Sequence, residues 1–177
     1  DAYLQASLYA YKLEPSADAA IGCAAMAFKK GDIDGSVKFF DEAISYETDN
    51  VKKAESAYKA ASVLASAKKI SQARSYAQKA ISFNENYGAP YILIAQLYAG
   101  NYKWNDEPAL NKCTFFAAID KLQRAKAVDP SVAEEANKLI SSYSAYTPEA
   151  KDLFMLGYKA GDRITIGGWI GETTTIR

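Results

Sequence analysis

Apolar residues recur every three or four positions along most of this chain, which is the spacing of one face of an α-helix. Short breaks that contain Gly, Pro, Asn or Asp separate the segments with this period. The pattern therefore predicts a succession of short helices and an all-α chain. The predicted helical segments are residues 1–13, 17–30, 31–44, 52–67, 70–81, 88–99, 118–130, 131–146 and 147–160.

One alanine near the end of every second segment indicates that the helices form repeating pairs. These alanines are 33, 37 and 45 residues apart, close to a repeat of about 34 residues with insertions. A small residue also lies seven positions earlier, on nearly the same helix face. Because helices approach to about 8–10 Å only where facing side chains are small, we predict closely packed pairs. The small residues are Ala10, Ala43, Ala80 and Ala125, preceded by Ser36, Ala73 and Ala118, with Ala24, Ala61 and Ala95 on the first helices.

The chain resembles the tetratricopeptide repeat (TPR) family in three of its second helices. They read GDIDGSVKFFDEAI (31–44), ISQARSYAQKAI (70–81) and AIDKLQRAKAVDP (118–130), and the last has small, large, small and proline residues at the family's spacing. The resemblance implies an all-α fold, a right-handed TPR-like α-solenoid of about three repeats. The repeats are divergent, because the family's tryptophan-like position in the first helix holds other residues. Those residues are Ala20, Ala57 and Tyr91.

The repeats are predicted to occupy residues 1–130, followed by two capping helices and a short β-hairpin. Residues 1–13 look like a second helix without its first helix, which leaves apolar side chains such as Leu8 and Tyr11 without their natural cover. We therefore expect either a longer repeat array that includes this chain or a homo-oligomer through this uncovered N-terminal helix. The predicted segments are a half repeat at 1–13, repeats at 17–46, 51–83 and 88–128 with a loop insertion at 100–111, capping helices at 131–160 and a hairpin at 163–177.

The C-terminal helices have sequence signals for their ends. Ser131 with Glu134 matches a capping box, and Thr147 with Pro148 matches an N-cap followed by proline at the first helical position. Gly161 is predicted to end the second of these helices.

The last fourteen residues, ITIGGWIGETTTIR, alternate β-branched and other residues and predict a hairpin that turns near Gly171 and Glu172. Gly167 and Gly168 indicate a bulge or a close approach. An isolated hairpin is marginal in water, so we expect it to pack on the preceding helix through Trp169. The segment from Phe154 onward is similar to the tail of exported TPR proteins of the Bacteroides group, which implies a periplasmic or cell-envelope location.

Composition and charge exclude several functions. Lys plus Arg and Asp plus Glu each number 21, and no basic run exceeds two residues, which argues against a nucleic-acid partner. No apolar run approaches the roughly 20 residues of a transmembrane helix. We therefore expect a chain with no nucleic-acid partner and no transmembrane segment.

Catalytic chemistry is scarce in the sequence. The chain contains no histidine, the commonest general base and metal ligand. Cys23 and Cys113 lie among apolar or small residues, which favours buried free thiols over a disulfide and gives no metal-ligand spacing. We therefore expect no enzymatic activity, no cofactor and no metal.

Binding is the better-supported function, because first helices line the inner groove of a stacked repeat array. Small groove residues interspersed with aromatic and basic ones suit a peptide or a partner helix. The alternative is that these residues only pack against the next helix. The candidate groove residues of this protein-binding or peptide-binding scaffold are Ile21, Phe28, Lys29, Tyr58, Lys59, Ser62, Ile92 and Gln96.

The insertion at 100–111 gives a second candidate site. Tyr102 and Trp104 are aromatic residues in a polar loop, where they would stack on a sugar ring if exposed. This favours a glycan-binding accessory protein as the alternative function. The competing interpretation is that the loop folds its aromatic side chains back onto the helices.

Overall fold

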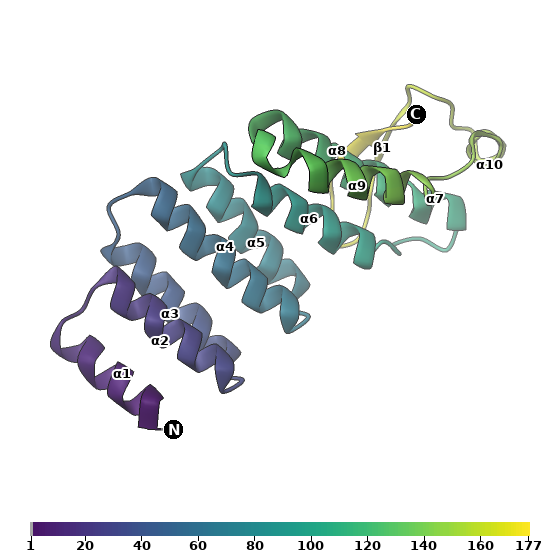
Figure 1. The fold of residues 1–177 in the computed structure, drawn as a ribbon. Helices are drawn as coiled ribbons and strands as arrows, with labels where there is room; N and C mark the ends of the chain where they lie inside the picture. Colours follow the sequence, from purple (N-terminus) through teal and green to yellow (C-terminus); the bar gives the residue numbers. More distant parts are fainter. Residues whose placement is uncertain (1) are drawn as a thin grey trace. The chain divides into compact units, whose positions relative to one another are not determined.

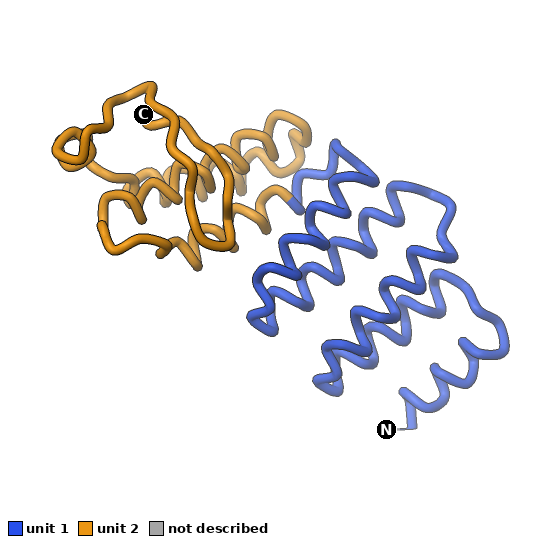
Figure 2. Tube along the Cα trace, turned by 180° about the vertical axis from the view of Figure 1, so that it is seen from behind, with its two compact units in different colours: residues 1–90 blue, residues 91–177 orange. Residues whose placement is uncertain are grey.

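Helices make up most of the protein, as the apolar spacing predicts. A computed structural model describes residues 2–177, and the fold is all-α with one small C-terminal sheet. The chain divides after Pro90 into two compact units, residues 1–90 and 91–177 (Figure 2). Each unit is described separately below.

Unit 1 consists of consecutive helices joined by tight turns, which run back and forth as helical hairpins (Figure 1). α2 packs on α3 and α4 packs on α5, while α3 also contacts α4 and α1 contacts α2. The helices are α1 (Ala2–Leu13), α2 (Ala17–Lys29), α3 (Ile33–Tyr46), α4 (Asn50–Ser66) and α5 (Ile70–Phe83).

Side chains at the start of three helices satisfy backbone N–H groups that have no partner within the helix. The Ser16 hydroxyl accepts a bond of 3.1 Å from the Ala19 amide at the start of α2. The Asp32 carboxylate accepts one of 2.9 Å from Gly35 at the start of α3. The Asp49 carboxylate accepts a hydrogen bond from a backbone amide at the start of α4. Local sequence therefore determines where these helices begin.

The small residues predicted at helix contacts in unit 1 are buried, except for Ala10. Ala43, Ala73 and Ala80 are fully buried on second helices, as are Ala24 and Ala61 on first helices. The backbones approach closely at these positions because a methyl group is the largest side chain between them. The equivalent residue of the half repeat, Ala10, is instead exposed, because α1 packs on α2 through Leu8 and Tyr11.

Unit 2 begins within α6 and ends with the two-stranded sheet. The insertion, predicted as a loop over 100–111, contains a short helix because Pro108 favours a helix start. The elements are α6 (Gly88–Gly100, whose first three residues belong to unit 1), α7 (Pro108–Lys112), α8 (Thr114–Val128), a 3₁₀ turn (Pro130–Val132), α9 (Ala133–Ser144), α10 (Ala150–Met155), β1 (Arg163–Thr165) and β2 (Thr173–Thr175).

The predicted caps of the last two helices are wrong. Ser131 lies inside the 3₁₀ turn and donates its amide and hydroxyl to Asp129, so α9 begins later, at Ala133. Thr147 does not cap α10, because its hydroxyl donates to the carbonyl of Ser144.

The predicted stop of α10 is also wrong. α10 ends at Met155 rather than at Gly161, since Gly157 has a positive φ of 89° and the Tyr158 amide bonds back to Leu153 at 2.9 Å. This is the usual glycine-terminated helix end, placed four residues earlier than predicted.

The hairpin exists and is antiparallel, with Ile164 opposite Thr174, but its connection spans residues 166–172 rather than a tight turn at Gly171 and Glu172. Trp169 packs on α6, whereas the sequence predicted packing on the helix before the hairpin. Its ring meets the Tyr98 ring of α6 edge to face, with centroids 5.5 Å apart. A seven-residue connection lets Trp169 reach a helix far away in the sequence.

Side chains of α6 and α8 hold the hairpin in place within unit 2. Glu172 accepts a hydrogen bond of 2.5 Å from the Tyr98 hydroxyl and one of 2.6 Å from Lys121. Asp120 accepts a bond of 2.6 Å from Thr174 and pairs with Arg177. The hairpin is therefore anchored by long-range polar contacts as well as by its buried isoleucines.

Candidate functional site

The predicted groove residues of unit 1 lie on the first helices α2 and α4, and they differ in exposure. Phe28 is 43% exposed at the end of α2, next to the exposed Lys29. Ile21 is half-buried and packs against two clusters of core residues. Phe28 and Lys29 are therefore accessible, whereas Ile21 belongs largely to the helix packing.

Three groove residues follow one another along α4. Tyr58 is half-buried, and its ring meets the Tyr87 ring edge to face with centroids 5.4 Å apart. Ser62, one turn further, donates its hydroxyl to the Tyr58 carbonyl at 3.1 Å. Lys59 is exposed. Tyr58 is thus held by an aromatic neighbour, and its orientation is restricted.

The two groove lysines, Lys29 and Lys59, form no ion pair with any residue that the structure describes. An ammonium group without an ion-pair partner can attract an acidic group of an incoming ligand. Solvent and salt screen this attraction. We name Phe28, Lys29, Tyr58, Lys59 and Ser62 the first-helix surface.

The remaining two groove residues belong to unit 2. Ile92 is buried within α6, and Gln96 on the same helix is exposed. Ile92 is therefore unavailable to a partner.

The aromatic side chains of the insertion fold back onto unit 2. The ring centroids of Tyr102 and Phe115 are 5.2 Å apart, and the backbone carbonyl of Tyr102 accepts a hydrogen bond from the Thr114 hydroxyl. The Trp104 ring lies so close to Gly167 that a Cβ there would be 2.7 Å from it. One face of the indole is therefore covered, and the structure gives the glycan-binding interpretation no support.

The two thiols are free and buried, as expected from their sequence context. Burial raises the pKa of Cys113 to about 11 and also raises the pKa of Cys23. Both thiols stay protonated at neutral pH, so neither is an activated nucleophile. Within residues 2–177 no three His, Cys, Asp or Glu side chains lie close enough to hold a metal ion.

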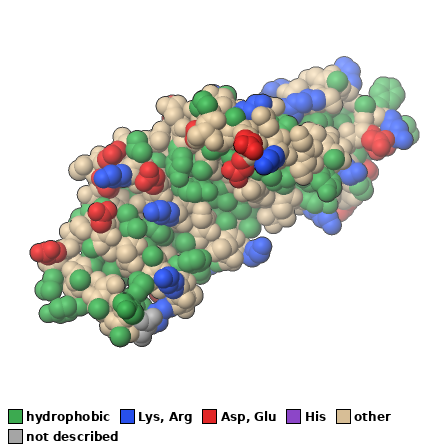
Figure 3. Space-filling view, in the orientation of Figure 1, with side chains coloured by type: hydrophobic (Ala, Val, Ile, Leu, Met, Phe, Trp, Pro, Cys, Tyr) green, Lys and Arg blue, Asp and Glu red, His purple; other side chains and the backbone are tan. Residues whose placement is uncertain are grey.

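Charges are dispersed over the visible face of the described residues (Figure 3). No helix within residues 2–177 is long and apolar enough to cross a membrane.

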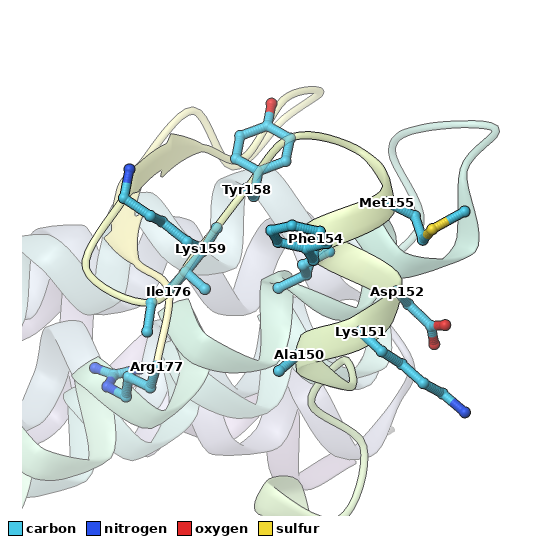
Figure 4. A pocket seen from close by; sticks show the side chains of 11 residues that line it. Ala150, Lys151, Asp152, Phe154, Met155, Tyr158, Lys159, Ile176 and Arg177 are labelled. Carbon is cyan, nitrogen blue, oxygen red and sulfur yellow. The ribbon is translucent and has the colours of Figure 1, made fainter.

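Two surface features were missed at the sequence level. One is an apolar cavity of about 580 Å³ beside α10, with Phe154 and Tyr158 at its edge (Figure 4). Phe154 and its neighbour Met155 are 75% and 85% exposed. The run of apolar residues at 153–156 was an available signal, but it also fits a buried helix. The other feature is a cavity between α1 and α3.

The exposed residues of α1 concern the predicted homo-oligomer through the N-terminal helix. Tyr9 and Leu13 are largely exposed on this helix. Self-association through α1 stays a prediction.

Comparison with known proteins shows that the fold of this chain is similar to that of several solved structures. No protein-family model matches the chain, and no curated protein matches it. The structure is similar to the TPR2B-domain:pHsp70-complex of yeast Sti1, with a TM-score of 0.57, 22% identity, and 73% of this chain and 96% of that chain covered. It is also similar to the first TPR of Spaghetti (RPAP3) bound to the HSP90 peptide SRMEEVD, with a TM-score of 0.55, 17% identity, and 73% and 93% covered.

A third similar structure is MamA, with a TM-score of 0.55, 15% identity, and 86% of this chain and 85% of that chain covered. The TPR-like fold predicted from the second-helix segments is confirmed by these likenesses. The similarity of the C-terminal tail to exported proteins of the Bacteroides group finds no support among them, and the envelope location stays a prediction.

Proposed function

We propose that this protein is a non-enzymatic scaffold whose first-helix surface binds a segment of a partner protein. The observation that carries the proposal is the accessibility of Phe28 beside Lys29, at the end of a helix whose other apolar residues are largely buried. A large apolar ring exposed next to an unpaired cation suits recognition of a peptide that has both apolar and acidic groups.

The arrangement on α4 supports the same proposal. Tyr58 is fixed by Tyr87 and loses little conformational freedom when a partner covers it. Lys59 adds a second cation on the same helix. Two of the similar solved structures, the TPR2B-domain:pHsp70-complex of Sti1 and the first TPR of Spaghetti (RPAP3) bound to an HSP90 peptide, support the proposal that this chain also binds a protein segment.

The non-enzymatic part of the proposal rests on chemistry. The sequence contains no histidine, and both thiols are held protonated by burial. The acidic pairs Asp106–Glu107 and Glu134–Glu135 are exposed or half-exposed adjacent residues, and none of the four carboxylates lies in the buried setting typical of a general acid. A stacked-helix scaffold needs none of this chemistry.

The experiment selects peptides from a displayed random library on the whole chain and measures the affinity of the selected peptides by fluorescence anisotropy. Tyr58→Glu and Ser62→Glu place a charge on the first-helix surface and are expected to weaken binding about tenfold or more. The matched control is Ser75→Glu, because Ser75 is an exposed serine on the second helix α5 whose hydroxyl also bonds within its own helix.

Helicity measured by circular dichroism should be unchanged in all three variants. Equal affinity of the Tyr58 and control variants would place the binding surface elsewhere and refute the assignment.

A further inference from the structure

A cavity of about 510 Å³ lies between α1 and α3, and none of its residues belongs to the first-helix surface. We call it the α1–α3 groove. Its volume lies within the range of sites that hold small ligands or side chains. The apolar part of its wall consists of Leu8 and Pro15 on one side and the rings of Tyr11, Phe39 and Tyr46.

The aromatic wall is ordered by its own contacts. Tyr11 is only 8% exposed, and its ring meets Phe39 at 6.1 Å and Tyr46 at 6.2 Å between centroids, both edge to face. Edge-to-face pairs of this kind stabilise one another beyond the area that they bury. The wall is therefore formed before any ligand arrives.

The one acid of the groove is already engaged. Burial, followed by hydrogen bonds to Glu42 and Tyr46, raises the pKa of Tyr11 well above its ordinary value of 10.0. The phenol therefore keeps its proton at neutral pH and bonds to the Glu42 carboxylate. This hydrogen bond gives Glu42 a partner inside the protein.

The cations of the groove are not engaged. Lys12 and Lys38 are exposed, and neither forms an ion pair with any residue in the described part of the chain. By contrast, Lys69 at the start of α5 pairs with Asp34 of α3 at 2.8 Å. The α1–α3 groove thus combines an apolar wall with two unpaired positive charges and one internally bonded acid.

The lining residues follow the helix axes. Leu8 lies on α1 and Pro15 in the connection that follows it, whereas Phe39 and Tyr46 are seven positions apart on α3. Seven residues of helix rise about 10 Å, the length of roughly three extended residues. A groove of this length, bordered by two parallel rows of side chains, suits a stretch of polypeptide.

We propose that the α1–α3 groove is a second peptide-binding site, which takes a partner segment whose apolar side chain is flanked by acidic residues. The apolar side chain packs on Phe39 and Tyr46, and the acids pair with Lys12 and Lys38. This site is independent of the first-helix surface, and either can exist without the other.

The test measures fluorescence anisotropy of fluorescein-labelled synthetic peptides with the whole chain. The peptides carry a single Leu, Phe, Tyr or Trp between Asp or Glu residues. One control set replaces the acids by Lys, and another replaces the apolar residue by Ser. The acidic apolar peptides are expected to bind, with affinity that falls as salt is raised, because exposed ion pairs are screened.

Charge reversal locates the site. Lys12→Glu with Lys38→Glu is expected to weaken binding by about tenfold or more, whereas Lys12→Arg with Lys38→Arg retains it. Lys112→Glu with Lys138→Glu makes the same change of net charge on unit 2 and should leave affinity within about twofold. Tyr46→Ser, at the exposed edge of the groove, should also weaken binding.

Several outcomes would overturn the proposal. They are the absence of binding by every acidic apolar peptide, equal loss in the Lys112 and Lys138 control, and equal affinity for the Ser-substituted peptides. Loss of binding in Lys29→Glu with Lys59→Glu but not in the Lys12 and Lys38 variant would assign the peptide to the first-helix surface. Sedimentation equilibrium tests a further occupant of the groove, a second copy of this chain. If the chain self-associates and Lys12→Glu with Lys38→Glu abolishes this association, the occupant is that second copy.

Discussion

The Ser36 hydroxyl donates a hydrogen bond of 2.9 Å to the carbonyl oxygen of Ala24, and both residues are completely buried where α3 crosses α2. Both are small residues that the sequence predicted to lie at helix contacts. The serine is small enough to allow the close approach, and its hydroxyl finds a partner on the helix that it touches. A buried polar group is tolerated under these conditions.

This contact predicts a graded loss of stability. Ser36→Ala removes one buried hydrogen bond and should lower the free energy of unfolding by about 1 kcal/mol. Ser36→Leu also inserts bulk between two backbones and should cost about 2–4 kcal/mol. Chemical denaturation followed by circular dichroism measures both values.

The matched control is Ser45 on the same helix, whose hydroxyl bonds to Glu42 at an exposed site. Ser45→Leu should change stability by no more than about 0.5 kcal/mol. A Ser36→Leu variant as stable as the Ser45→Leu variant would contradict the close packing of α2 on α3.

The ends of α2 and α4 predict a stabilising substitution. Gly31 ends α2 with φ 79°, and Lys68 ends α4 with φ 61° in the same pattern of backbone hydrogen bonds. A lysine in this left-handed conformation costs about 1 kcal/mol relative to glycine. Lys68→Gly should therefore raise the free energy of unfolding by about 1 kcal/mol, and Gly31→Lys should lower it by a similar amount.

Lys30→Gly is the control for this pair, because Lys30 has a right-handed conformation at φ −83°. It should be neutral or slightly destabilising. Thermal unfolding curves compare the three variants, and no gain in Lys68→Gly would show that α4 ends differently.

The contact between Trp104 and Gly167 predicts a steric effect. A Cβ at Gly167 would lie 2.7 Å from the indole ring, so Gly167→Ala must displace the ring or the hairpin loop. We expect a loss of about 1–3 kcal/mol and a shift in tryptophan fluorescence. Gly100→Ala is the control, since a Cβ there would meet nothing within 4 Å. Identical spectra and stabilities of the two variants would refute the contact.

The turn before β1 predicts a pH effect of known sign. The Lys159 backbone amide donates to the Asp162 carboxylate at 2.9 Å and, with the Lys159 side chain, lowers the pKa of Asp162 below its ordinary value of 3.8. A lowered carboxyl pKa in the folded state adds stability above the unfolded pKa, and this stability is lost as the pH falls through the folded pKa.

Carboxyl NMR titration should therefore place the midpoint of Asp162 below 3.8. Lys159→Ala should leave most of the shift in place, because the backbone amide is its larger cause. In Asp162→Asn the corresponding loss of stability at low pH should disappear. A midpoint at or above the ordinary value would mean that the turn is not formed as described.

Much of the fold was predictable because its determinants are local. Helix period depends on residues within one or two turns of each other. The small residues Ala43 and Ala80 predicted the helix pairs, because only small side chains permit the approach. The end of α10 was harder, since Gly157 and Gly161 are equally good local stops and the choice depends on the packing of buried Leu153.

The candidate sites were only partly predictable. The sequence placed Phe28 and Lys29 on a first helix, but their accessibility depends on which neighbours cover them. The α1–α3 groove was not predicted, because Tyr11 looked like an uncovered apolar residue until Phe39 and Tyr46 were placed beside it.

The sequence by itself determined most of the helices, their order and, from α2 to α5, their pairing through small residues. The tertiary structure decided that Trp169 meets Tyr98, that Trp104 covers Gly167 and that Lys12 and Lys38 border one groove. Helix formation is governed by side chains a few positions apart, whereas these contacts join residues dozens of positions apart. Such contacts depend on the relative placement of whole helices, which no local spacing encodes.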